Sequence, residues 1–126
     1  MFEMQPLSAP IIKYMLALNA LDNEDGIRCV EIAENLSLSK PTVHIMMGTL
    51  SEMAYVVKAK YGMVFLTEKG REAAVRYAGY HDTICRFLAQ KLGVSQEESK
   101  KATLSLLAGM SGESLEHMCR SVKDLK

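Results

Sequence analysis

The sequence predicts a mainly α-helical fold, in which three helices and one β-hairpin are followed by three more helices. Two observations support this. Apolar residues recur at helical spacing along most of the 126 residues, and two short β-rich runs interrupt them near the middle. The composition is 48% apolar and 24% charged, which is enough apolar material for a buried core in a chain of this length.

The first predicted helix follows Pro10 and extends to Leu21, and its apolar residues cover more than one face, so we expect it to be central. A polar turn at residues 23–26 separates it from a short second helix at about 29–35. Residues 36–39 are too few for anything but a tight link. Ser39 then caps the third helix, whose first turn tolerates Pro41.

A β-hairpin is predicted after the third helix. Residues 55–58 and 63–66 are rich in β-forming side chains and flank a turn at 59–62. Thr67 is placed to cap a long helix that starts at Glu68, and Gly79 marks a possible bend or break in it.

Two further helices complete the chain. Ser95 and Glu98 form a capping-box pattern for one, and residues 113–125 form a last short one. Three helices followed by a two-stranded hairpin is the order of a winged helix-turn-helix, which presents its recognition helix to the DNA major groove. The alternative is a small helical domain with an incidental hairpin.

Three sequence blocks carry a resemblance to a known family. Residues 30–43 (VEIAENLSLSKPTV), residues 66–70 (LTEKG), and the His81, Phe87-Leu88 and Leu92-Gly93-Val94 positions resemble, in order and spacing, the iron- and manganese-dependent DtxR/MntR repressors. The resemblance covers roughly residues 8–125. It implies a DNA-binding winged helix-turn-helix at 1–72, a helical dimerisation domain at 73–126, and a homodimeric transcriptional regulator or repressor.

The resemblance also implies a divalent-metal site, but this sequence departs from the ligand pattern. The positions of the family's carboxylates, its histidine and its later Glu-His ligands carry Lys13, Leu16, His81, Leu104, Leu107 and Ala108. Only His81 retains a ligand, and an ammonium repels a divalent cation. We therefore expect no bound metal, no cofactor, and a former site filled by packing.

Two other metal arrangements stay open. His81 and Cys85 stand four residues apart on one helix face, and His117, Met118 and Cys119 lie near the C-terminus, so a soft-ligand site is conceivable. Glu116-His117 spells the family's Glu-His pair, but reaching it needs an insertion of about nine residues in a helix that aligns without gaps, so we reject it. The plain interpretation of the three cysteines is that they are reduced and packed.

Seven residues are predicted to contact double-stranded DNA. Five of them lie near the start of the recognition helix or along its outer face, namely Ser39, Lys40, Thr42, His44 and Thr49. The other two, Lys58 and Lys60, lie on the wing. Ile45 also faces outward, where it can meet a thymine methyl group or a protein partner.

The charge distribution favours a second hypothesis. Residues 1–72 hold seven Lys and Arg against nine Asp and Glu, a net charge of −2, whereas residues 73–126 hold eight against six, a net charge of +2. An acidic DNA-binding half is unusual, so the alternative is a protein-interaction module on a winged-helix scaffold that has lost strong DNA binding.

Other classes are disfavoured. We do not expect an enzyme, because the sequence has no Gly-rich phosphate loop, no HExxH and no GxSxG. No apolar run approaches the roughly 18–20 residues that cross a bilayer, and the N-terminus does not have the order of a signal peptide. We therefore expect a cytoplasmic protein without membrane contact.

Overall fold

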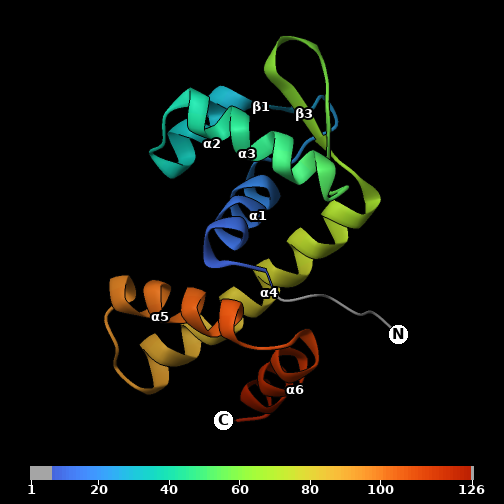
Figure 1. The fold of residues 1–126 in the computed structure, drawn as a ribbon. Coiled ribbons are helices and arrows are strands. Elements are labelled where there is room, and N and C mark those ends of the chain that lie inside the picture. Colours follow the sequence, from blue (N-terminus) through green and yellow to red (C-terminus); the bar gives the residue numbers. More distant parts are fainter. Residues whose placement is uncertain (1–6, 126) are drawn as a thin grey trace. The chain divides into compact units, whose positions relative to one another are not determined.

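The computed structural model describes residues 7–125, and these form six α-helices and a small sheet (Figure 1). The helices are α1 (Ala9–Leu21), α2 (Cys29–Leu36), α3 (Lys40–Glu52), α4 (Glu68–Lys91), α5 (Gln96–Gly109) and α6 (Gly112–Lys123). The described residues divide into two compact units, one formed by residues 13–75 and the other by residues 7–12 together with residues 76–125. The predicted mainly α fold with a winged helix-turn-helix is confirmed.

In the unit 13–75, α2 and α3 are joined by a three-residue turn. Ser37 ends α2 in the left-handed conformation (φ 56°), and the N–H of Leu38 donates to the carbonyl of Ala33 (2.9 Å). Ser39 begins α3, because its hydroxyl accepts a hydrogen bond from the Thr42 N–H at 3.3 Å. The predicted cap and tight link are both present.

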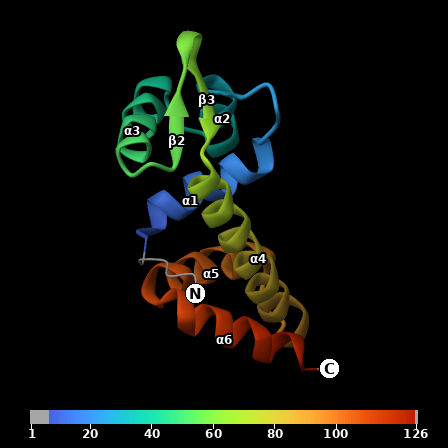
Figure 2. The same ribbon diagram turned by 90° about the vertical axis from the view of Figure 1, so that its right-hand side faces the viewer.

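The sheet has one strand more than the sequence indicated. Strands β2 (Val56–Lys58) and β3 (Met63–Leu66) form the predicted antiparallel hairpin, in which Val57 pairs with Phe65. Strand β1 (Ile27–Arg28) pairs with the other edge of β3, which gives the order β1-β3-β2. A segment of two residues shows no alternation in sequence, so only its partner β3 reveals it. Figures 1 and 2 both show the tip of the hairpin projecting beyond α2 and α3.

Apolar side chains from the helices and from the hairpin form the core of this unit. The largest that are almost completely buried are Met15, Leu18, Ile27, Ile32, Met47 and Leu50. Val43 and Met47 are buried on the inner stripe of α3, while His44 and Ile45 on its other side are exposed. Burial of one stripe therefore fixes which face of α3 is free.

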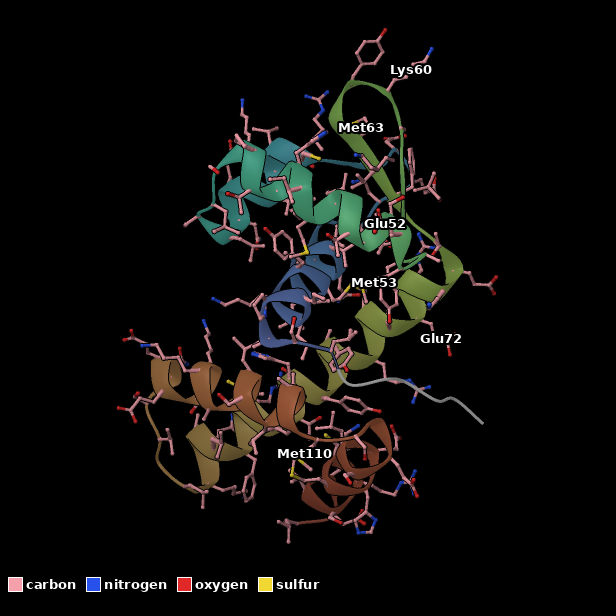
Figure 3. All side chains as sticks on the ribbon, in the orientation of Figure 1. Glu52, Met53, Lys60, Met63, Glu72 and Met110 are labelled. Carbon is pink, nitrogen blue, oxygen red and sulfur yellow. The ribbon has the colours of Figure 1, made fainter. Side chains whose placement is uncertain are left out.

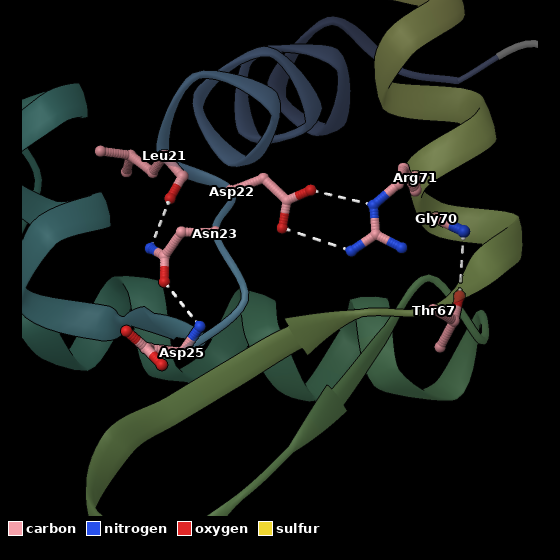
Figure 4. Close-up of polar contacts among 7 residues, drawn as sticks. All are labelled: Leu21, Asp22, Asn23, Asp25, Thr67, Gly70 and Arg71. Atoms are coloured by element: carbon pink, nitrogen blue, oxygen red, sulfur yellow. Dashed lines mark hydrogen bonds and ion pairs between the residues drawn. The ribbon is translucent and has the colours of Figure 1, made fainter.

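The LTEKG segment joins the hairpin to α4 through contacts with the end of α3. The Thr67 hydroxyl donates to the carbonyl of Ala54 (2.6 Å) and accepts from the N–H of Gly70 (2.9 Å), and it thereby caps α4 (Figure 4). The Lys69 ammonium donates to the carbonyl of Met53 (3.0 Å) and lies over the Tyr55 ring. A Cβ atom at Gly70 would overlap the backbone oxygen of Tyr55, so only glycine permits this approach.

In the other unit, residues of α4, α5 and α6 bury a smaller core. Tyr77, Leu107 and Leu115 are almost completely buried, and Cys119 is 5% exposed. Ser95 and Ser111 cap α5 and α6 by accepting from the N–H groups of Glu98 and Ser114. The break considered at Gly79 does not occur, because α4 is one uninterrupted helix from Glu68 to Lys91. Among the described residues, no helix is long and apolar enough to cross a membrane.

Candidate nucleic-acid interface

The start of α3 presents two of the predicted DNA-contacting hydroxyls, and they bond to each other. The Ser39 and Thr42 side-chain oxygens are 2.7 Å apart and both residues are exposed. Pro41 has no N–H, and the N–H groups of Thr42 and Val43 bond to Ser39, so the attraction for an anion such as a backbone phosphate comes from the positive end of the helix dipole together with the exposed Lys40. Thr49 is also exposed, but its hydroxyl points back to the carbonyl of Ile45 at 3.5 Å.

A hollow of about 780 Å³ lies where α2, α3 and the hairpin tip meet, and we call it the cationic hollow. Its lining consists of residues 28–30 at the start of α2, Lys40, Pro41 and His44 on α3, and residues 61–63 of the hairpin. None of these lining residues is acidic. The structure therefore brings Lys40 and His44 together with Arg28 beside the exposed start of the recognition helix.

The basic side chains of the unit 13–75 fall into two groups. Arg71 is paired with Asp22, with a 2.9 Å Nε–Oδ2 distance (Figure 4), and Lys69 bonds to the end of α3. The second group, Arg28, Lys40, Lys58 and Lys60, forms no ion pair with any described carboxylate and is exposed. Unpaired cations keep their full charge for a polyanion.

The predicted wing lysines lie close to this hollow. Lys60 stands at the hairpin tip (Figure 3), next to the lining residue Tyr61. Lys58 is near enough to the Cys29 thiol to lower its pKa, although burial, the larger influence, raises the pKa of this half-buried thiol above its ordinary value. Cys29 itself lines the hollow, so Lys58 adds positive charge at its edge.

Two features of this surface escaped sequence reasoning. Arg28 belongs to the short strand β1 and precedes α2, and its backbone N–H donates to the Glu31 carboxylate (3.2 Å), which leaves the guanidinium to line the hollow. Tyr61 is 96% exposed at the hairpin tip. The signal for Arg28 was a basic residue directly before a helix, but its place beside Lys40 depends on the fold.

Comparison with known proteins connects this geometry to a family. Residues 67–126 match the iron dependent repressor, metal binding and dimerisation domain, and residues 13–60 match the IclR helix-turn-helix domain. An uncharacterised HTH-type transcriptional regulator of Methanocaldococcus jannaschii is 31% identical over 97 residues, which are 77% of this chain and 78% of that protein. This chain belongs to the metal-dependent repressor family of transcriptional regulators. The resemblance seen in the sequence is confirmed.

Other members of the family extend the comparison. The HTH-type transcriptional regulator MntR of Geobacillus kaustophilus is 35% identical over 85 residues, 67% of this chain and 60% of that protein. The structure of the manganese regulator SloR has a TM-score of 0.66 and 28% identity, and that of the metal-dependent transcriptional regulator MtsR has a TM-score of 0.72 and 21% identity. The two alignments include 93% and 95% of this chain, but only 55% of SloR and 55% of MtsR.

The family description includes metal binding, but the implied ligand positions carry side chains that a divalent cation does not favour. Lys13 is an exposed cation and Leu107 is completely buried. His81 is half-buried, and burial together with Lys100 lowers its pKa below the ordinary value. Within residues 7–125, no three His, Cys, Asp or Glu side chains gather where they could hold a metal ion. The described residues therefore do not fit the family's metal.

Glu116, half of the apparent Glu-His pair, has other partners. The Tyr80 hydroxyl donates to its Oε2 at 2.6 Å, and Arg76 and Arg120 approach its carboxylate at 3.3 and 3.7 Å. The hydrogen bond from Tyr80, supported by Arg76, Arg120 and Lys123, holds the pKa of Glu116 below its ordinary value despite partial burial. This carboxylate connects α4 and α6 and is not free as a ligand.

Proposed function

We propose that this protein is a homodimeric transcriptional regulator that binds double-stranded DNA without needing a metal. The observation that carries DNA binding is the cationic hollow, which Arg28 and Lys40 line beside the exposed start of α3 without an acidic lining residue, and which borders the hairpin that carries Lys58 and Lys60. The matched C-terminal domain, through which the family dimerises, supports a homodimer. DNA binding then belongs to residues 1–72 and dimerisation to residues 73–126.

Each predicted contact has a role in this proposal. The first turn of α3, capped by Ser39 and Thr42, holds a phosphate together with Lys40 and Arg28. His44 and Thr49 lie on the exposed side of α3 and reach base edges in the major groove. Lys58 and Lys60 contact the backbone from the wing. This function involves no catalytic step, and it places the protein with the DNA in the cytoplasm.

Metal independence is supported by the composition of the former site. Leu107 is completely buried in the core formed by α4, α5 and α6, and the Tyr80–Glu116–Arg76 contacts fasten α6 to α4. We propose that these apolar and polar contacts hold the dimerisation region in one conformation. In this proposal they replace the bound metal ion that would hold the same conformation in metal-dependent relatives. His81 and Cys85 stay a possible soft-ligand pair, with no third donor among the residues described.

The test begins with the full chain and a random DNA library, from which the protein enriches its own duplex. Affinity for that duplex, compared with a scrambled one, is then measured by fluorescence anisotropy in EDTA, in Mn²⁺ and in Zn²⁺. We expect specific binding that is equal within about twofold under all three conditions. Tightening by a metal contradicts metal independence alone, whereas no preference over the scrambled duplex contradicts DNA recognition.

A second function is favoured by one observation. Ile45 is 72% exposed at the centre of the outer face of α3, and Val57 on the wing is 55% exposed. Exposed apolar side chains of this kind suit a protein partner. The absence of acidic residues from the lining of the cationic hollow weighs against this alternative, and enrichment of a specific duplex by the full chain would reject it as the main function.

A further inference from the structure

The turn at the tip of the wing contains a residue that its backbone conformation disfavours. Tyr61 and Gly62 both have positive φ angles, 63° and 72°, and the N–H of Met63 donates to the carbonyl of Lys60. This is the signature of a type I′ turn, in which both central positions favour Asn, Asp or Gly. Gly62 satisfies that preference, but Tyr61 places a Cβ atom and a bulky ring in the left-handed region, which costs conformational energy.

The ring receives no compensation from the fold. Tyr61 is 96% exposed, more than any other large hydrophobic residue among those described. The hairpin on which it stands is well ordered by pairing: Lys58 pairs with Val64, and the N–H of Ala59 donates to the carbonyl of Met63 at 2.8 Å. A strained and solvated aromatic residue on a firm support indicates that its contacts are made with another molecule.

The surroundings of Tyr61 point to the chemistry of that molecule. Lys60 precedes it at the tip (Figure 3), and Tyr61 lines the cationic hollow with Arg28 and Lys40. A cationic setting with one amphipathic ring suits a nucleic-acid backbone, since the ring can pack on the apolar edge of a deoxyribose while the hydroxyl bonds to a phosphate. These positively charged side chains would not complement the surface of an apolar protein partner.

We propose that Tyr61 is a positioning DNA contact, whose ring enters the minor groove that flanks the major groove occupied by α3. Tyr61 and α3 border the same hollow, and the tip projects beyond α2 and α3, so a duplex seated against α3 meets the tip in its neighbouring groove (Figures 1 and 2). The minor groove is about 6 Å wide and walled by deoxyribose, which accommodates a flat ring. This inference rests on the proposed function and extends it to the base pairs outside each half-site.

The test uses Tyr61→Asn and Tyr61→Gly in the full chain, because both residues accept the positive φ of this turn. We expect both variants to keep or slightly raise the melting temperature, and to bind the duplex enriched by the wild-type protein about tenfold more weakly. Hydroxyl-radical footprinting of the same duplex, which reports on deoxyribose exposure, should lose protection at a few sugars outside each half-site and keep the central protection.

The outcomes separate this inference from the function on which it rests. Unchanged affinity and footprint in both variants overturn the role of Tyr61 while leaving DNA recognition intact. Weaker binding with an unchanged footprint rejects the minor-groove assignment. If the wild-type chain itself does not prefer its enriched duplex over a scrambled one, the proposed function fails, and the inference fails with it.

Discussion

At the scale of single residues, the placement of charges decides how a net-negative segment can present a positive surface. The Asp22–Arg71 pair removes one charge of each sign and leaves the net charge unchanged, whereas no acidic residue lines the cationic hollow. Arg28, Lys40, Lys58 and Lys60 stay unpaired among the described residues. The net charge of −2 for residues 1–72 therefore understates the affinity of this surface for anions.

The first prediction concerns Arg28, which lines the cationic hollow and forms no ion pair with a carboxylate of residues 7–125. Arg28→Ala should weaken binding to specific and scrambled duplexes alike, because a phosphate contact carries no sequence information. In a homodimer it should reduce the slope of log affinity against log salt by about 2, roughly one per protomer. The measurement is a salt titration by fluorescence anisotropy.

The matched control for Arg28 is Lys101→Ala. This change removes the same charge from α5, where Lys101 is exposed and 3.9 Å from Glu97. The control should leave the salt slope unchanged. An equal fall in slope for both variants would show that only net charge matters, and would argue against a localised contact at the hollow.

At the scale of elements, the LTEKG segment fastens the wing to α4. Thr67 and Lys69 donate to the carbonyls of Ala54 and Met53, which lie at the end of α3, and Gly70 lies against the backbone of Tyr55. These contacts satisfy carbonyls that the end of α3 leaves open. The LTEKG segment is recognisable in sequence because Thr67, Lys69 and Gly70 are all needed where the hairpin connects to α4.

Gly70→Ala and Gly79→Ala form a second prediction on one helix. A methyl group at 70 overlaps the backbone oxygen of Tyr55, whereas at 79 it meets no described atom within 4 Å. We expect Gly70→Ala to destabilise the protein by about 3 kcal/mol or more, and Gly79→Ala to stabilise it by about 0.5–1 kcal/mol, since glycine is a poor helix former. Urea unfolding of both variants measures the two effects, and similar shifts would contradict the close approach.

The contact between α4 and α6 gives a third prediction, on pH. Tyr80 and Arg76 hold the pKa of Glu116 below its ordinary value of 4.5, so the folded state binds this proton less readily than the unfolded state. The stabilisation by this contact is therefore complete above about pH 4.5 and disappears as the pH falls through the lower folded-state value. It should amount to less than about 1 kcal/mol, because the Glu116 side chain is 44% exposed.

The pH prediction is checked by comparing the wild type with Glu116→Gln and Tyr80→Phe in urea across a pH series. Both variants should be less stable than the wild type near neutral pH, and Glu116→Gln should approach the wild type in acid. Tyr80→Phe should lower the free energy of unfolding less in the Glu116→Gln background than in the wild type, since residue 116 is then no longer charged. If the stability difference between the wild type and Glu116→Gln were the same at every pH, the ionisation of Glu116 would not contribute to stability.

At the scale of the whole molecule, a two-fold dimer constrains the DNA sequence that the protein can read. If two copies present α3 to successive major grooves, the recognition helices stand about 34–36 Å apart. The enriched duplex should therefore be an inverted repeat, with half-site centres about 10–10.5 base pairs, or a multiple of that, apart. Sequencing of the enriched pool measures the spacing, and a single non-repeated site would contradict binding as a symmetric dimer.

Much of the fold was predictable because its signals are local. Ser39 caps α3, Thr67 caps α4 and Ser95 caps α5, and each lies at the boundary that its side chain indicated. The hairpin follows from two β-rich runs around a turn with glycine. Strand β1 was missed because two residues carry no periodicity, and the break considered at Gly79 does not occur because one isolated glycine weakens a helix without ending it.

The sequence by itself determined the order of the elements and the family, because these are properties of consecutive or regularly spaced residues. Only the tertiary structure decided which charges are available. Arg71 meets Asp22 across 49 residues, Tyr80 meets Glu116 across 36, and Arg28 comes beside Lys40 and Tyr61. Coulomb interactions and hydrogen bonds act over a few ångströms in space, so distance along the chain does not reveal them.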